Sequence, residues 1–107
     1  MGDQEYKQAV KLTLKTIGGK WKPIILCFLR ERVMRFGEFK REIPEITEKM
    51  LTQQLRELEH DGIISRKVYL QVPPKVEYSL TEYGQTIHEV LDVMHKWGLQ
   101  HKNRVDQ

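Results

Sequence analysis

The chain lacks the usual signs of a secreted, membrane-bound or disulfide-stabilised protein. Its 107 residues contain one cysteine, Cys27, so no disulfide can form within the chain. No apolar run approaches the roughly 18 residues that a membrane-spanning helix needs. The stretch Met1–Gln8 has no apolar centre of the kind found in signal peptides. We therefore expect a cytoplasmic protein without a membrane partner.

Patterns for catalysis and metal binding are also missing. The sequence has no glycine-rich phosphate loop, no nucleophile elbow and no convincing pair of catalytic side chains. Its histidines are scattered, and His88 and His95, seven residues apart, are too far along a helix to share a metal ion. We expect neither an enzyme nor a bound metal or cofactor.

Length and charge point to one small domain with a basic tendency. We predict a single domain over residues 1–107. The net charge is only +3, so the placement of charge is more informative than its total. Ten of the 18 Lys and Arg residues lie in the first 41 positions, against four Asp and Glu. The segment Ile63–Val76 contains three basic residues and no acid.

Apolar periodicity predicts helices over the first part of the chain. Gln4–Ile17 is the first, ended by Gly18-Gly19, and Lys20–Arg32 is the second, with Pro23 in its first turn. The second helix is apolar almost all round, which predicts a central, buried element. Because Cys27 lies within this apolar run, we expect a buried and inert thiol.

A short strand at Val33–Arg35 and a short helix at Phe36–Ile43 are expected next, with Pro44 ending the helix. Thr47 is a plausible N-cap for a further helix that reaches about Asp61, and Gly62 fits the left-handed position after it.

This further helix has two distinct faces. At about 100° per residue, Leu51, Leu55 and Leu58 fall on one side and anchor the helix to a core. The opposite sector has polar side chains that can donate hydrogen bonds, and no carboxylate occupies its middle. These residues are Lys49, Thr52, Gln53, Arg56 and His60.

Two alternating segments follow, joined by Pro73-Pro74. Along Ile64–Val72 the apolar Val68, Leu70 and Val72 share one face, and the return strand turns Val76, Tyr78 and Leu80 inward. Because proline cannot extend an internal strand, Pro73-Pro74 marks the tip of a hairpin. Thr81 then caps a final long helix to about Lys102.

The order of these elements is that of a helix-turn-helix followed by a wing. We predict an α+β fold, mainly helical, with a two-stranded wing and long N- and C-terminal helices. Such a fold presents one helix to the major groove of DNA and a hairpin to the backbone beside it.

Several motifs in this order resemble the HxlR-type winged-helix transcriptional regulators of bacteria, which are relatives of the MarR family. The resemblance covers about Ile17 to Trp97. The residues that carry it are Ile17–Lys22, Arg35–Phe39, Ile46–Gly62, Val72–Thr81 and Trp97-Gly98. The resemblance implies a homodimeric DNA-binding regulator, more often a repressor, whose first and last helices build the dimer.

One departure from the family pattern concerns oxidant sensing. Family members that sense oxidants or electrophiles usually carry a cysteine upstream of the tryptophan in the Gly-Lys-Trp run. In this chain the corresponding place is near Gln8-Ala9-Val10, where no cysteine is found. The resemblance therefore does not extend to thiol sensing by that route.

The polar face of the Thr47–Asp61 helix supplies the candidate base contacts. Arg56 is the first choice, because arginine can bind guanine through two hydrogen bonds, worth about 1–3 kcal/mol of discrimination. Gln53 could read adenine in the same way, Thr52 could contact a base or a phosphate, and Lys49 suits a phosphate. The alternative is an ordinary solvated helix face, and for His60 the two interpretations are equally good.

Basic residues beside this helix are candidates for contacts with the DNA backbone. Arg66, Lys67 and Lys75 flank the wing, where they could bind phosphates or the minor groove. They could instead be charges that keep an exposed hairpin soluble. Arg35, near a helix start, is a further candidate phosphate contact.

The apolar stripes of the terminal helices are the candidate dimer interface, namely Val10, Leu14, Ile87, Val90, Leu91, Met94 and Trp97. A cavity between subunits near Met94 and Trp97 could hold a small-molecule effector, although no residue pattern indicates one. The expected partners are thus double-stranded DNA and a second copy of the chain. A winged-helix module that binds proteins and not DNA is the alternative function.

Overall fold

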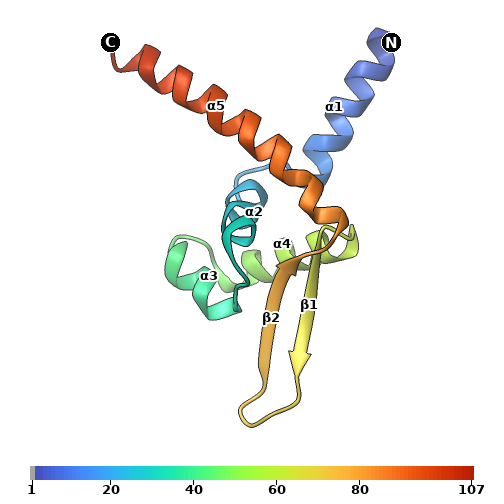
Figure 1. Ribbon diagram of the computed structural model, residues 1–107, viewed down its shortest axis with the longest axis vertical. Helices are drawn as coiled ribbons and strands as arrows, with labels where there is room; N and C mark the ends of the chain where they lie inside the picture. The colour runs from blue at the N-terminus through green and yellow to red at the C-terminus, as the bar shows by residue number, and fades with distance from the viewer. Residues whose placement is uncertain (1) are drawn as a thin grey trace.

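Three helices, a hairpin and the inner ends of the first and last helices enclose one apolar core, from which the first and last helices extend as two diverging arms (Figure 1). The computed structural model describes residues 2–107. Its elements, in chain order, are α1 (Asp3–Ile17), α2 (Lys22–Glu31), α3 (Phe36–Glu42), α4 (Glu48–His60), β1 (Ile64–Tyr69), β2 (Lys75–Leu80), the 3₁₀ turn η1 (Tyr83–Thr86) and α5 (Ile87–Val105). This is the predicted winged helix-turn-helix, with α3 and α4 as the helix pair and β1–β2 as the wing.

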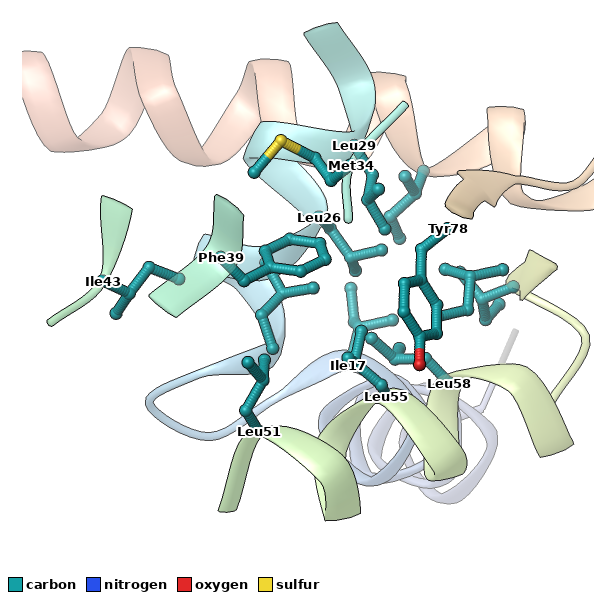
Figure 2. Close-up of a cluster of buried hydrophobic side chains, with 14 of the residues drawn as sticks. Ile17, Leu26, Leu29, Met34, Phe39, Ile43, Leu51, Leu55, Leu58 and Tyr78 are labelled. Atoms are coloured by element: carbon teal, nitrogen blue, oxygen red, sulfur yellow. The ribbon is translucent and has the colours of Figure 1, made fainter. Parts of the chain in front are cut away.

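The core joins α4 to α2, α3 and the hairpin. Leu51, Leu55 and Leu58 point from α4 into the apolar cluster and are almost fully buried, which confirms the predicted inner face of this helix (Figure 2). On the other side of the cluster, the rings of Phe39 and Tyr78 meet edge to face with centroids 6.2 Å apart. Each such side chain contributes about 1.5–3 kcal/mol by its burial, so the core fixes the orientation of α4.

The local signals at the ends of the helices act as predicted. The Thr47 hydroxyl oxygen accepts a hydrogen bond from the backbone N–H of Met50 at 3.0 Å and caps the start of α4. After α4 the chain reverses at Gly62, whose φ of 76° is a conformation that side chains other than glycine rarely adopt. Pro23 lies in the first turn of α2.

The wing is shorter than the sequence suggested. The antiparallel strands pair from Ile64 opposite Leu80 to Tyr69 opposite Lys75, so the predicted continuation of β1 through Val72 is wrong. Leu70 and Val72 are 97% and 100% exposed, because the hairpin at this point has left the helical body and nothing apolar opposes it. The predicted strand at Val33–Arg35 is reduced to a single bridge between Met34 and Tyr78.

The α2 helix is buried on one side only, and the prediction that Cys27 is buried is wrong. Ile25, Leu26 and Leu29 belong to the core, whereas Ile24, Cys27 and Glu31 are exposed. Residues at this spacing share one helix face, and no other element of the described chain covers that face. Partial burial raises the pKa of the Cys27 thiol, an effect that the nearby Arg30 opposes, so the thiol stays largely protonated at neutral pH.

Two arms, α1 and α5, carry apolar side chains that the described chain leaves exposed. They are Tyr6, Val10, Leu12 and Leu14 on α1, and Val93, Met94, Trp97, Leu99 and Val105 on α5.

The final helix begins later than predicted, because the Thr81 hydroxyl accepts from the Gly84 backbone N–H at 2.8 Å and starts η1 first. None of the described helices is long and apolar enough to cross a membrane.

Gly84, in η1, packs directly against the backbone of Ile63 just before β1, and its substitution tests this packing. A Cβ on Gly84 would overlap the Ile63 carbonyl oxygen, so Gly84→Ala should lower the free energy of unfolding by about 1–3 kcal/mol. The matched control is Gly37→Ala in α3, where a Cβ meets nothing and stability should be unchanged or slightly higher. Urea unfolding at one fixed protein concentration measures both, and equal stabilities would show that Gly84 can shift without cost.

Candidate nucleic-acid interface

The exposed side of α4 gathers four of the predicted contact residues in one shallow hollow. Lys49, Thr52, Gln53 and Arg56 line it together with Glu48 and Glu57. They meet there because positions three and four apart share one face of a helix, while the leucines opposite them are held in the core. The structure therefore brings together four of the five residues of the predicted polar sector.

Arg56 lies at the centre of this surface. It borders three neighbouring hollows, which extend along α4, toward the wing and toward α1. Within residues 2–107 its guanidinium forms no ion pair, and the side chain is exposed. Its five N–H donors are thus available to an external acceptor.

Arg66 faces the same hollow as Arg56 from the other side. On β1 it pairs with Tyr78 of β2, and with Thr52, Glu59 and Arg56 it lines a hollow of about 350 Å³ between α4 and the wing. Two arginines from different elements therefore converge on one concave surface. Such a concentration of positive charge favours a polyanion, with Glu59 as a partial counterweight.

Lys67 and Lys75 lie on the opposite face of the hairpin from Arg66, because successive side chains of a strand alternate. Both ammonium groups rest over the Tyr69 ring, at 4.8 and 4.6 Å from its centroid. Lys75 also forms an ion pair with Glu77 at 3.6 Å. The three predicted wing residues thus form two groups, and Lys75 is already partly neutralised.

Arg35 and His60 lie outside the central group. Arg35 precedes α3, where its backbone N–H donates to Glu38 at 2.8 Å, and its side chain borders a separate hollow with Arg41. His60, at the end of α4, lines the hollow toward α1 beside Lys15. Neither residue is brought into the hollow that Arg56 shares with Arg66.

A chain of contacts that no sequence pattern predicted lies beneath this surface. The ammonium of Lys22, from α2, donates to one carboxylate oxygen of Glu57 at 2.6 Å. The Gln53 amide donates to the other oxygen at 3.1 Å. A lysine on an otherwise apolar helix was a usable signal, since lysine is almost never buried without a partner. The partner itself could not be identified, because Glu57 lies 35 positions further along the chain.

The hydrogen bond from Lys22, and then that from Gln53, lower the pKa of the Glu57 carboxyl. The side chain of Lys22 is only 8% exposed, whereas that of Glu57 is 43% exposed. The carboxylate at the edge of the polar face is therefore ionised and is compensated from below by a cation.

The predicted interface residues on the arms fall into two groups. Val10, Leu14, Met94 and Trp97 are exposed, and Val90 is half-buried. Ile87 and Leu91 are buried in the core of the chain itself, so they can add little area to a contact with another chain. The Trp97 ring stacks on His101 with centroids 5.0 Å apart.

Comparison with known proteins assigns the class. Residues 16–106 match the HxlR-like helix-turn-helix family, and the chain belongs to this family. It is a transcriptional regulator of the helix-turn-helix type.

Relatives and solved structures agree with this assignment. The chain is 56% identical over 105 residues to the uncharacterised HTH-type transcriptional regulator YtcD of Bacillus subtilis, over 98% of this chain and 83% of the relative. A crystal structure of an HTH-type transcriptional regulator ytcD superposes with a TM-score of 0.85 at 57% identity, covering 88% and 96% of the two chains. The redox regulator HypR in its reduced form gives 0.87 at 51% identity, covering 92% and 97%.

The Lys22–Glu57 pair leads to a prediction about acid stability. Glu57→Gln removes the charge that compensates a buried ammonium, so the free energy of unfolding at pH 7 should fall by about 1–2 kcal/mol. Because the pKa of Glu57 is lowered in the folded state, the contribution of the carboxylate is present above the ordinary glutamate pKa, about 4.3. It is lost as the pH falls through the folded-state pKa.

Chemical unfolding of both proteins between pH 7 and pH 3 tests this expectation. The difference between wild type and Glu57→Gln should shrink as the pH falls below about 4. Glu59→Gln, which removes an exposed charge from the same helix, should stay within about 0.5 kcal/mol of wild type throughout. A constant gap between wild type and Glu57→Gln would mean that the carboxylate does not carry the effect.

Proposed function

We propose that this regulator acts as a cytoplasmic homodimeric repressor that binds a pseudo-palindromic operator with α4 in the major groove. The observation that carries the proposal is the placement of Arg56. It is exposed, without an ion pair in the described chain, at the centre of a face whose opposite side is fixed in the core.

The side chains around Arg56 suit the edge of a DNA duplex. Arg56 offers a paired donor to guanine, and Gln53 and Thr52 one turn earlier can contact neighbouring bases. Lys49, nearer the start of α4, suits a phosphate. The nearest carboxylate inside this surface, Glu57, is compensated by Lys22 and therefore repels phosphate less than a free glutamate would.

The wing would contact the backbone beside the groove. Arg66 shares a hollow with Arg56, so an α4 placed in the groove would bring Arg66 close to the adjoining strand. Lys67 on the other face of the hairpin is free to contact a phosphate, and Lys75 would first have to leave Glu77. Arg35, which lies farther from the hollow, would contact a phosphate of the DNA backbone.

Dimerisation would cover the exposed apolar side chains of α1 and α5. Val10, Leu14, Met94 and Trp97 lie on two arms that extend from the body of the protomer (Figure 1). A two-fold symmetric dimer would present two α4 helices about 34–36 Å apart, which matches successive major grooves. Occupying such a site blocks access to a promoter, which is why repression is proposed. The space between subunits is the proposed place for any small-molecule effector.

Arg56→Ala tests the assignment of α4 as the recognition helix. Loss of a bidentate contact should weaken binding to the operator by about 1–3 kcal/mol and relax the preference at one base pair per half-site. Fluorescence anisotropy with the duplex upstream of the protein's own gene and with a scrambled duplex measures both effects.

Lys67→Ala is the matched control for Arg56→Ala. It removes one positive charge from the wing and should weaken both duplexes alike, with a shallower dependence on salt. Unchanged affinity and preference in Arg56→Ala would refute the proposed recognition face. If wild type bound neither duplex, the repressor proposal would fail, and a protein-binding module would replace it.

Trp97→Lys tests the dimer. Placing a charge on the exposed apolar side of α5 should destabilise a subunit contact, and the species seen by light scattering should shift from dimer to monomer. Val33→Lys is the control, because Val33 is also exposed, 49% against 64% for Trp97, but lies between α2 and α3 and not on an arm. A dimer that persists in Trp97→Lys would place the interface elsewhere.

A further inference from the structure

Lys22 lies beneath the polar face of α4 and not on it. It begins α2, its side chain is 8% exposed, and its Nζ lies 2.6 Å from a Glu57 oxygen. A residue so buried has little surface with which to reach a DNA phosphate. Any influence of its charge on DNA binding would therefore pass through Glu57.

Glu57 connects Lys22 to a side chain that does lie on the face. While one carboxylate oxygen accepts from Lys22, the other accepts from the Gln53 amide at 3.1 Å, one helical turn earlier. The cation thus fixes the carboxylate, and the carboxylate fixes the amide. A glutamine side chain has up to about 2 kcal/mol of rotamer entropy to lose, so holding it in advance lowers the cost of a later contact.

The geometry of an amide group allows this contact and base recognition at once. A glutamine amide has two N–H donors and one carbonyl acceptor. Recognition of adenine uses the carbonyl oxygen and one N–H, to N6 and N7 of the base. The second N–H can remain on Glu57, so Gln53 does not have to release its partner when DNA binds.

We propose that Lys22 is a positioning residue for base recognition, which acts through Glu57 to hold Gln53 in the orientation that reads one base pair of the operator. This inference rests on the proposed function, with α4 in the major groove. Lys22 has a second effect in the same arrangement, because its charge compensates Glu57 and reduces the repulsion between that carboxylate and the DNA backbone. The two effects are separable, since compensation changes affinity for all duplexes and positioning changes discrimination.

The test is a set of operator duplexes in which each base pair is replaced in turn. Binding is measured by anisotropy for wild type, Gln53→Ala, Lys22→Met and Glu57→Gln. Gln53→Ala identifies the base pair that Gln53 reads, as the position where discrimination falls about tenfold. Lys22→Met, which keeps the length of the side chain and loses the charge, should flatten discrimination at that same position. The double variant Lys22→Met with Gln53→Ala should lose no more discrimination than Gln53→Ala alone.

Two control variants separate positioning from charge. Lys20→Met removes an exposed positive charge two residues away, and Glu45→Gln removes an exposed negative charge just before α4. Both should change overall affinity and leave the discrimination profile as in wild type. Lys22→Arg, which keeps the charge, should restore part of the discrimination. A profile in Lys22→Met that is uniformly weaker but unchanged in shape would overturn the inference.

An NMR measurement on the protein without DNA distinguishes a loss of positioning from a loss of folding. The side-chain amide protons of Gln53, observed by NMR in the free protein, should change shift when Lys22→Met or Glu57→Gln is introduced, while the backbone spectrum stays folded. Unchanged Gln53 resonances in both variants would also overturn the inference. If wild type fails to discriminate among duplexes, the proposed function fails first, whereas intact discrimination with an unaltered Lys22→Met profile refutes the positioning role alone.

Discussion

The burial of one row of leucines on α4 is the constraint on which the rest of this structure depends. Leu51, Leu55 and Leu58 are held by a core that spans α2, α3 and the hairpin, so α4 cannot rotate about its axis without exposing them (Figure 2). Because the helix is fixed on its inner side, the opposite residues are presented outward in a defined order. A flexible polar helix would have to be ordered at the moment of binding, and this one is already in place.

Features that depend on neighbouring residues were predictable from the sequence, and features that depend on what covers a surface were not. The cap at Thr47, the reversal at Gly62 and the two faces of α4 follow from a few residues each, and the structure confirms them. The burial of Cys27 and the extent of β1 to Val72 depend on whether another element lies opposite, which periodicity cannot reveal. Both predictions were wrong for that reason.

The candidate site also has some contacts that neighbouring residues predict and others that depend on distant parts of the chain. Periodicity alone grouped Lys49, Thr52, Gln53 and Arg56, because they share one helix. That Arg66 points toward Arg56 of α4 could not be predicted in this way. It depends on the register of the hairpin, in which Arg66 lies opposite Tyr78. The contact of Lys22 with Glu57 joins residues 35 positions apart and depends on how α2 crosses α4, so no local pattern contains it.

Charge in this protein is arranged locally, and the total of +3 says little about what its surface attracts. Several acids are held by basic neighbours within the chain: Glu57 by Lys22, Asp92 by Arg30, Glu38 by Arg32 and Glu77 by Lys75. These pairs leave Arg56 and Arg66 as positive charges without ion-pair partners at the junction of α4 and the wing, among the residues that the structure describes. A small number of well-placed charges gives a weak non-specific attraction to DNA. Tight binding then has to come from contacts with particular bases, which favours a sequence-specific regulator over a general DNA-coating protein.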